Sequence, residues 1–286
     1  MAARSEREAH GPSSTLNREE IIAMNDHGRK VLVMASSKGL GLAIAKRLAK
    51  NRSEVVICGR NKASLDRAVG DLQKIEGCAG AHGIIADLAR RADVDMLLQR
   101  TLELLGSIDC LVVNSGHMPY GTLEDLDDDD WDHSYETLLM SAVRVSRAAA
   151  AAMKASGRGG DIVYVSSAGV HEVTGHLLLS NVMRAGIAVL AKHLADTLSG
   201  SGVRVNVVAP GYFDTGRVHK RIEALMVDEG LNRDAAIERV ANTNPLGRIG
   251  TADELAELVG FIVGDRARYI NGTTIVMDGG GSRLVI

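Results

Sequence analysis

Short apolar runs alternate with amphipathic stretches along most of this chain, and this alternation constrains the fold more than any other feature. Seven runs are typical of strands: Lys30–Ala35, Ser53–Cys58, Gly83–Ala86, Ile108–Asn114, Asp161–Val165, Val203–Val208 and Thr273–Met277. Strands that are apolar almost throughout indicate a parallel sheet that helices cover on both faces. The pattern therefore predicts an α/β fold built on a doubly wound, mostly parallel sheet of about seven strands.

Six stretches between these runs have the apolar spacing of helices. They are Leu40–Lys50, Leu65–Ile75, Asp93–Leu105, Asp127–Met153, Ser180–Leu198 and Ala252–Val263. Residues 216–239 are charged and amphipathic, which predicts two short helices. The acidic residues 127–130 suit the positive end of a helix dipole, so we interpret them as a helix cap, and we predict no metal site.

The length of 286 residues suits one large α/β domain, which we place at residues 29–286 after an extension over residues 1–28. The net charge of −3 gives no reason to expect nucleic acid or an anionic membrane as a partner. No apolar run is as long as the roughly 18 residues of a membrane span. We expect a cytoplasmic protein in which Cys58 and Cys110 are buried, reduced thiols.

The turn after the first strand carries the first sign of a function. It consists of Ala35, Ser36, Ser37, Lys38, Gly39, Leu40 and Gly41. Glycines let the backbone approach a bound pyrophosphate, and the free N–H groups at the start of the next helix favour an anion. The turn therefore predicts a nucleotide site.

The end of the second strand indicates which nucleotide binds. A carboxylate there would bind the adenosine ribose 2′-hydroxyl of NAD, but this chain has Arg60. Arg60 and Lys38 together suit a 2′-phosphate and predict NADP(H) as the cofactor. The alternative is that both cations are merely solvated.

Together these motifs resemble the short-chain dehydrogenase/reductase family, from about Lys30 to about Gly281. The glycine turn is similar to the family's Thr-Gly-x-x-x-Gly-x-Gly, with Met34 and Ala35 at its first two positions. The resemblance implies a Rossmann fold and further cofactor contacts. Those contacts are Asp87 and Leu88 at adenine, Asn114, Ser115 and Gly116 after the fourth strand, and Pro210, Gly211 and Thr215 at the nicotinamide.

The catalytic positions of that family are only partly retained. Ser167 matches the family's Ser and precedes Ser180 by 180 − 167 = 13 residues. Ser180 stands at the position of the family's catalytic Tyr, Arg184 at that of its Lys, and Leu138 at that of its helix Asn. A Ser hydroxyl is a far poorer acid than a Tyr, and an Arg does not lose its proton near neutral pH. We therefore expect Arg184 to keep a binding role, at the nicotinamide ribose and through its charge, and to lose the proton relay.

Other side chains in the loops around the pocket are candidates for the missing proton donor. We favour His171, His176 and Tyr120, and we also consider His117 and Tyr212. Tyr164 lies inside the fifth predicted strand and is expected in the core. His193 and His219 lie on predicted helices and are expected at the surface.

These expectations favour an atypical NADPH-dependent ketoreductase whose substrate is activated by Ser167, Ser180 or Arg184, with the proton coming from water, a His or the substrate. One alternative is an enzyme with the same fold that catalyses a non-redox reaction, such as cyclisation or dehydration. The other is an NADP-binding protein without catalytic activity. A lid is expected at about residues 213–245. Its Ile222, Leu225, Met226 and Leu231 suggest a fairly large apolar substrate, such as a polyketide or aromatic carbonyl compound.

The resemblance also implies a homotetramer or homodimer. Pairing is expected through the helices at residues 127–153 and 180–198, where the small-residue run Ala148–Ala152 would allow close helix approach.

Overall fold

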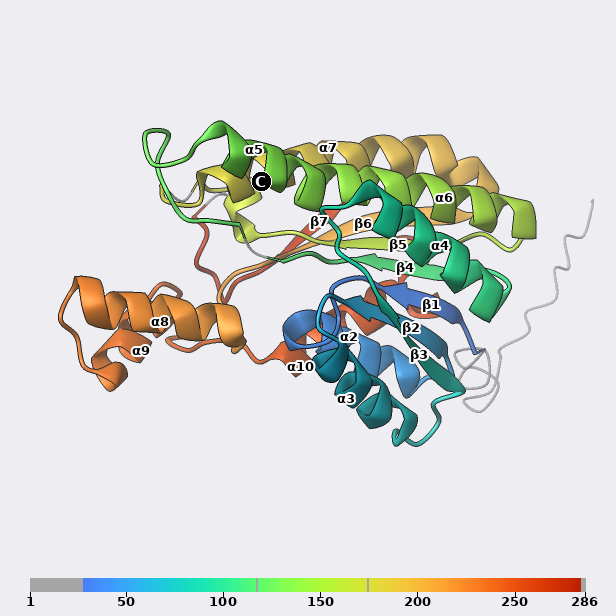
Figure 1. Ribbon diagram of the computed structural model, residues 1–286, viewed down its shortest axis with the longest axis horizontal. Helices are drawn as coiled ribbons and strands as arrows, with labels where there is room; N and C mark the ends of the chain where they lie inside the picture. Colours follow the sequence, from blue (N-terminus) through green and yellow to red (C-terminus); the bar gives the residue numbers. More distant parts are fainter. Residues whose placement is uncertain (1–27, 117, 174, 284–286) are drawn as a thin grey trace, which may run out of the picture.

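The computed structural model describes residues 28–116, 118–173 and 175–283, so nearly all of the expected N-terminal extension lies outside the described residues. Its centre is a parallel sheet of seven strands in the order β3-β2-β1-β4-β5-β6-β7 (Figure 1). The strands are β1 (Lys30–Val33), β2 (Glu54–Gly59), β3 (Gly80–Ile85), β4 (Cys110–Val113), β5 (Gly160–Val165), β6 (Val203–Pro210) and β7 (Thr274–Met277). The predicted fold class is confirmed.

Helices cover both faces of the sheet (Figure 1). One face carries α2 (Gly39–Ala49), α3 (Lys62–Gln73) and α10 (Ala252–Ile262), and the other carries α4 (Arg91–Leu105), α6 (Ser141–Ser156) and α7 (Leu178–Leu198). Within the described part of the chain, no helix is both long and apolar enough to span a bilayer.

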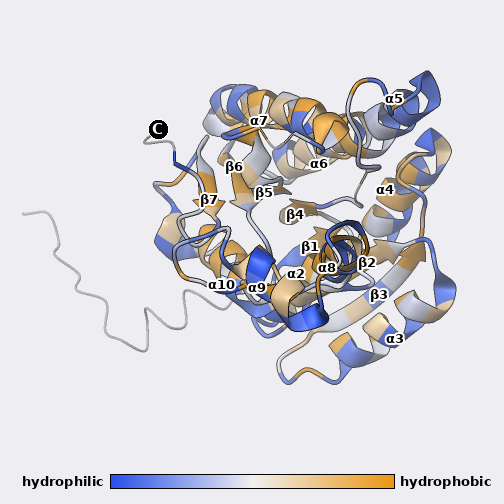
Figure 2. Cartoon of the chain, turned by 90° about the vertical axis from the view of Figure 1, so that its left-hand side faces the viewer, coloured by the Kyte–Doolittle hydropathy of each residue, from blue (hydrophilic) through white to orange (hydrophobic). Residues whose placement is uncertain are grey.

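Two further helices, α8 (Gly216–Asp228) and α9 (Arg233–Ala241), form a lobe beside the carboxyl ends of the strands (Figure 1). Both helices fall within residues 213–245, where the sequence predicts a lid, and that role stays a prediction. Figure 2 views the molecule from its side, with hydrophilic and hydrophobic segments next to one another along both helices.

The helix predicted at residues 127–153 is one helical run with an irregular middle. It consists of α5 (Asp128–Ser134), a π-helical segment (Tyr135–Met140) and α6. The Asp127 carboxylate accepts a hydrogen bond from the Asp130 amide at 2.9 Å, which confirms that the acidic run caps the helix. A π-helical segment widens the helix locally and is frequent at functional sites, but the apolar spacing alone does not reveal it.

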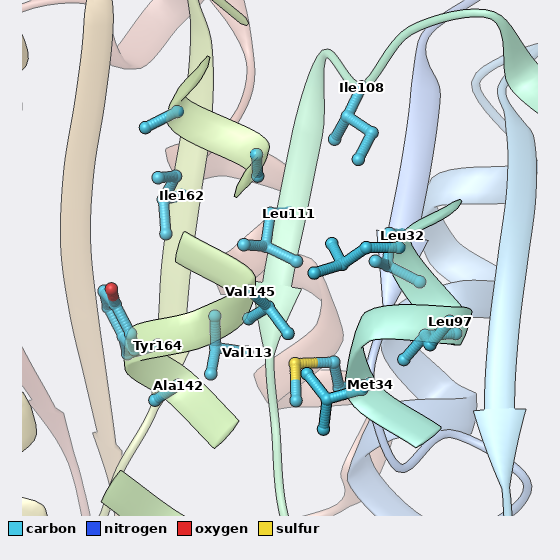
Figure 3. Packing of buried hydrophobic residues seen from close by; sticks show 14 of the residues in the cluster. Leu32, Met34, Leu97, Ile108, Leu111, Val113, Ala142, Val145, Ile162 and Tyr164 are labelled. Atoms are coloured by element: carbon cyan, nitrogen blue, oxygen red, sulfur yellow. The ribbon is translucent and has the colours of Figure 1, made fainter. Parts of the chain in front are cut away.

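The core between the sheet and the α4, α6 and α7 helices is closely packed, as Figure 3 shows for side chains such as Leu32, Leu111 and Val145. Tyr164 is buried here, as expected, and its hydroxyl shares a hydrogen bond of 2.5 Å with Ser146 Oγ. Cys58 and Cys110 are also fully buried, and burial raises the pKa of the Cys58 thiol to about 11. Both thiols are therefore protonated, structural side chains.

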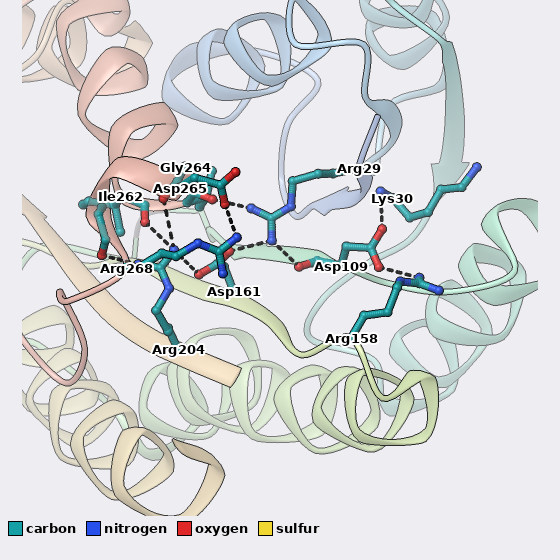
Figure 4. Close-up of polar contacts among 12 residues, drawn as sticks. Arg29, Lys30, Asp109, Arg158, Asp161, Arg204, Ile262, Gly264, Asp265 and Arg268 are labelled. Atoms are coloured by element: carbon teal, nitrogen blue, oxygen red, sulfur yellow. Dashed lines mark hydrogen bonds and ion pairs between the residues drawn. The ribbon is translucent and has the colours of Figure 1, made fainter. Parts of the chain in front are cut away.

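A buried carboxylate neutralises two arginines at the opposite end of the strands from the lid (Figure 4). Asp161, at the start of β5, lies 2.5 Å from Arg29 Nη2 and 2.7 Å from Arg204 Nη2. The Arg29 guanidinium also donates to the Asp109 carbonyl, and that of Arg204 to the Ile262 carbonyl. These bonds connect the amino ends of the central strands to α10.

We expect Asp161→Asn to lower the free energy of unfolding by about 3 kcal/mol, because it leaves two partly buried guanidinium charges without their shared counter-charge. Chemical denaturation followed by circular dichroism measures the change. Asp265→Asn is the matched control, since Asp265 pairs with the largely exposed Arg268 and should cost less than about 1 kcal/mol. Equal losses of unfolding free energy in the two variants would contradict a stabilising role for Asp161 and its two arginines.

Candidate functional site

A pocket of about 530 Å³ lies at the carboxyl ends of the strands, where the strand order reverses between β1 and β4. This reversal is where open α/β sheets bind their ligands. Most of the predicted site residues line the pocket. They are Ala35, Ser37, Lys38, Gly39, Leu40, Arg60, Asp87, Leu88, Asn114, Ser115, Gly116, Tyr120, Ser167, His176, Arg184, Pro210, Gly211 and Thr215.

Three predicted residues are not part of the pocket wall: Gly41, His171 and Ser180. The candidate His117 lies outside the described residues. The structure therefore brings the predicted cofactor residues together, and of the favoured proton donors it places Tyr120 and His176 in the pocket wall and His171 outside it.

The glycine turn is folded tightly under the pocket. A Cβ atom at Gly41 would come within 2.7 Å of the Ala35 carbonyl oxygen and 2.8 Å of Asn114 Nδ2, so only glycine fits there. Asn114 Nδ2 donates to the same carbonyl at 3.1 Å, which ties the turn to the end of β4. Ala35 itself adopts a φ of 46°, a left-handed conformation that costs an alanine on the order of 1 kcal/mol. The turn therefore forms with Ala35 at the position of the family's first glycine, and it bears this conformational cost.

The first turn of α2 offers an electrostatic niche that suits a phosphate. It contains no acidic residue, and the capping residue Lys38 makes no side-chain hydrogen bond to the helix N–H groups. These N–H groups therefore keep their full capacity to bind an anion. The pocket wall next to them fits a pyrophosphate.

The adenosine end of the pocket is cationic, with one acid beside it. The Arg60 side chain is 72% exposed, and its Nη1 lies 4.0 Å from Asp87 Oδ2, a distance that leaves the guanidinium available to a ligand. The other Asp87 oxygen accepts a hydrogen bond from the Ala89 amide, which fixes this carboxylate at the pocket wall. Lys38 forms no ion pair with any residue in the described ranges.

Arg184 is the central charged group at the other end of the pocket, lined by Ser167, His176 and Tyr120, which we call the catalytic end because the sequence predicts catalysis there. Its side chain is buried, and its Nη1 donates to the Val165 carbonyl at 2.9 Å and the Ser166 carbonyl at 3.1 Å. No described carboxylate pairs with it, and its Nη2 donates to no described residue. Burial, with a further contribution from Arg217, lowers the pKa of Arg184 to about 9. The guanidinium is therefore still charged at neutral pH, and it lies in a site where its field is weakly screened.

Ser180 supports Arg184 and is turned away from the pocket. Its Oγ is the acceptor of a hydrogen bond of 3.1 Å from Arg184 Nε, one helical turn along α7. Ser180 was a predicted catalytic candidate, but a side chain as short as Ser ends at this guanidinium and does not reach the pocket wall.

Ser167 is oriented for hydrogen bonding. Its Oγ accepts from the Gly169 amide at 3.2 Å and thereby caps a short 3-10 helix, Ala168–Val170. Because a hydroxyl accepts and donates at once, its own proton remains free for a group in the pocket.

Two of the candidate proton donors lie side by side at the rim. The Tyr120 and His176 rings are 5.7 Å apart and tilted by 50°. Burial and the charge of Arg221 lower the pKa of His176, so its imidazole is neutral near pH 7. His171 makes no contact with the pocket, and its Nε2 is buried without a hydrogen-bond partner among the described residues.

The pocket also contains residues that the sequence interpretation missed. They are His133 from α5, Thr137 from the π-helical segment that follows it, and Arg217, Lys220 and Arg221 from α8. The three cations occupy one helix face at positions i, i+3 and i+4, a spacing visible in the sequence.

The prediction of an apolar substrate relied on four side chains of the lid segment, and the structure places them elsewhere. Ile222, Leu225, Met226 and Leu231 do not line the pocket; they pack against α9 in the interior of the lobe, around Ala236 and Val240. An amphipathic helix has to bury its apolar face, and α8 buries it against α9. The face of α8 toward the pocket is the charged one.

Comparison with known proteins gives consistent matches along the chain. The family model described as enoyl-(acyl carrier protein) reductase matches residues 34–282. Dehydrogenase/reductase SDR family member 4 of Oryctolagus cuniculus is 33% identical over 274 residues, covering 95% of this chain and 99% of that protein. The uncharacterized oxidoreductase YvrD of Bacillus subtilis is 31% identical, covering 87% of this chain and 95% of that protein.

Solved structures agree with these matches. L-Sorbose reductase of Gluconobacter frateurii, solved with NADPH and L-sorbose, superimposes with a TM-score of 0.86 at 29% identity, covering 92% of this chain and 99% of that one. A variant of actinorhodin polyketide ketoreductase, solved with NADPH, has a TM-score of 0.84 at 26% identity, with coverage of 90% and 100%.

Proposed function

Because the chain belongs to the short-chain dehydrogenase/reductase family, we propose that it is an NADPH-dependent carbonyl reductase that works without the family's Tyr and Lys. One observation carries the proposal. A single pocket joins the phosphate-binding turn and Arg60 at one end to Ser167 and Arg184 at the other. The two similar reductases solved with NADPH support this choice of cofactor.

The residues present fit that cofactor. The N–H groups of α2 would bind the pyrophosphate, and Lys38 and Arg60 would bind the 2′-phosphate. Asp87 would lie at the adenine, and Thr215 at the nicotinamide amide. NADPH supplies the hydride that carbonyl reduction requires.

The catalytic work falls to Ser167 and Arg184. The free hydroxyl proton of Ser167 hydrogen-bonds the substrate's carbonyl oxygen, and the nearby Arg184 cation stabilises the negative charge that develops there. Arg184 contributes a fixed charge and no proton. Since the His176 imidazole is neutral near pH 7, the proton comes from water, from an acidic hydroxyl of the substrate or from another side chain of the pocket wall such as Tyr120 or His133.

The preference for NADPH over NADH is a direct test of the adenosine end. We expect the protein to bind NADPH at least about tenfold more tightly than NADH, because charge-assisted bonds to a phosphate exceed neutral ones. Lys38→Ala combined with Arg60→Ala should abolish the difference. Cofactor titration followed by fluorescence measures both affinities.

Lys62→Ala combined with Arg67→Ala is the matched control, since it removes the same charge from exposed positions of α3 outside the pocket. It should leave the preference unchanged. Equal or tighter binding of NADH by the unaltered protein would refute the assignment of Lys38 and Arg60.

The reaction itself is tested by NADPH oxidation with a panel of carbonyl compounds and analysis of the products. We expect one alcohol formed for each NADPH consumed. Conversion of a substrate without net NADPH consumption would favour a cyclase or dehydratase. Tight NADPH binding without turnover of any compound would favour a binding protein.

We further propose that the protein is a homo-oligomer in which α6 and α7 of neighbouring subunits pair. Two exposed apolar side chains of α7, Val182 and Val189, and the small residues of α6 support this surface.

A further inference from the structure

We infer that the substrate carries a negatively charged group, a carboxylate or a phosphate, which is held between the cationic face of α8 and Arg184. This inference rests on the proposed function, because it names the class of compound that the reductase takes. Its first support is the composition of the pocket wall at the catalytic end.

Three cations of α8 point to this end of the pocket: Arg217, Lys220 and Arg221. Arg217 and Arg221 are partly buried, yet none of the three is ion-paired with a residue in the described part of the chain. Their neighbour His219 does not line the pocket, and it pairs with Asp214 at 2.9 Å. The acid just before α8 therefore pairs outside the pocket wall, and the pocket cations remain without an ion-pair partner among the described residues.

These cations are close enough to the catalytic end to affect its groups. Arg217 contributes to the lowered pKa of Arg184, and Arg221 to that of His176. Arg217 and Arg221 line the pocket together with Arg184 and His176 and lie within electrostatic reach of them. Like charges gathered in this way repel one another until an anion enters.

Acidic side chains are nearly absent from the described pocket wall. Asp87 is its one acid, and it lies at the adenosine end beside Arg60. Proteins rarely leave a partly buried cluster of cations unpaired, because removing a charge from water is costly. A bound anion would supply the missing counter-charge.

The same wall contains a second unsatisfied polar group. Thr137, in the π-helical segment, lines the pocket, and its Oγ1 is buried without a hydrogen-bond partner among the described residues. A hydroxyl in this state is a ready donor to an oxygen anion.

The cofactor phosphates are the competing partners for these cations. The Thr215 side chain lies 3.7 Å from where a Cβ of Gly39 would be, so α8 begins close to the phosphate-binding turn. Arg221 follows more than one helical turn after Thr215, and its charge acts on His176. We therefore assign at least Arg221 to the substrate, and the experiment separates the two partners.

The test measures binding to the protein saturated with NADP⁺, using probe pairs that differ in charge. One pair is 4-oxo-4-phenylbutanoate and its methyl ester, and the other is dihydroxyacetone phosphate and dihydroxyacetone. By isothermal titration calorimetry, we expect the anion of at least one pair to bind at least about tenfold more tightly than its neutral partner. The pair with the larger ratio distinguishes a carboxylate from a phosphate.

Arg217→Gln combined with Arg221→Gln should remove this preference while changing the affinity for NADPH by less than about threefold. Arg233→Gln combined with Arg239→Gln is the control, since it removes two cations of α9 that do not line the pocket, and it should keep the preference.

Equal binding of the charged and neutral probes would overturn the inference. A second contrary result would be an α8 variant whose NADPH affinity falls as much as its anion affinity, since the cations would then bind the cofactor. Both results are read from binding, so they are independent of whether the protein reduces carbonyl groups. A protein that prefers anions but oxidises no NADPH would refute the reductase proposal alone.

Discussion

Replacing Arg184 with alanine is expected to lower kcat/KM for carbonyl reduction by about 10²- to 10³-fold, the loss typical of removing one group that stabilises a developing oxyanion. The guanidinium is buried at the end of β5, is held by the carbonyls of Val165 and Ser166, and has no described counter-charge. Its charge is therefore available to the reaction. Steady-state kinetics with NADPH and the best substrate of the panel measure the loss.

Arg184→Lys should recover cofactor binding but only part of kcat, because a lysine keeps the charge and no Tyr is present for it to activate. Lys192→Ala, two turns along α7 and outside the pocket, is the control and should remain fully active. Thermal unfolding of each variant shows whether the fold persists. An Arg184→Ala variant that is folded and retains most of its kcat would refute the catalytic role of this residue.

Ser167 and Ser180 are expected to differ sharply although both are serines of the same region. Ser167→Ala should lower kcat by about 10²-fold, because it removes the hydroxyl that donates to the substrate's carbonyl oxygen. Ser180→Ala should lower kcat less than about fivefold, since its Oγ only accepts a hydrogen bond from Arg184 Nε. The two variants are compared with the same substrate and saturating NADPH.

The affinity for NADPH serves as the control for both serine variants and should stay nearly constant. A drop of several orders of magnitude in kcat for Ser180→Ala, with cofactor affinity intact, would show that Ser180 is the acid. An unaffected Ser167→Ala variant would remove Ser167 from the mechanism.

The sheet was predictable because its signal is local. Most strands between Lys30 and Met277 are apolar runs of a few residues, a composition that burial on both faces by helices requires, and the partly exposed edge strand β3 is the exception. The cofactor end was predictable for a related reason. The spacing of Gly39 and Gly41 after an apolar run indicates a strand-to-helix turn, although the structure also ties this turn to Asn114 at the end of β4.

The catalytic end depends on contacts between distant segments, and there the sequence was a weaker guide. Ser167 and Ser180 were both predicted to hydrogen-bond the substrate, and the structure shows that the Ser180 hydroxyl contacts Arg184 while Ser167 lines the pocket. The orientation of α8 was also missed. Its apolar residues could face either the pocket or α9, and only the presence of Ala236 and Val240 opposite them decides.

Hydride transfer by this chain, without the family's Tyr, is tested most directly with NADPH that carries deuterium at the transferred position of nicotinamide C4. The unaltered protein and Ser180→Ala are each incubated with it and the carbonyl panel, and the products are analysed by mass spectrometry. We expect both proteins to form an alcohol with one deuterium at the carbinol carbon. An absence of deuterated alcohol from both proteins, or its formation by the unaltered protein alone, would contradict this mechanism.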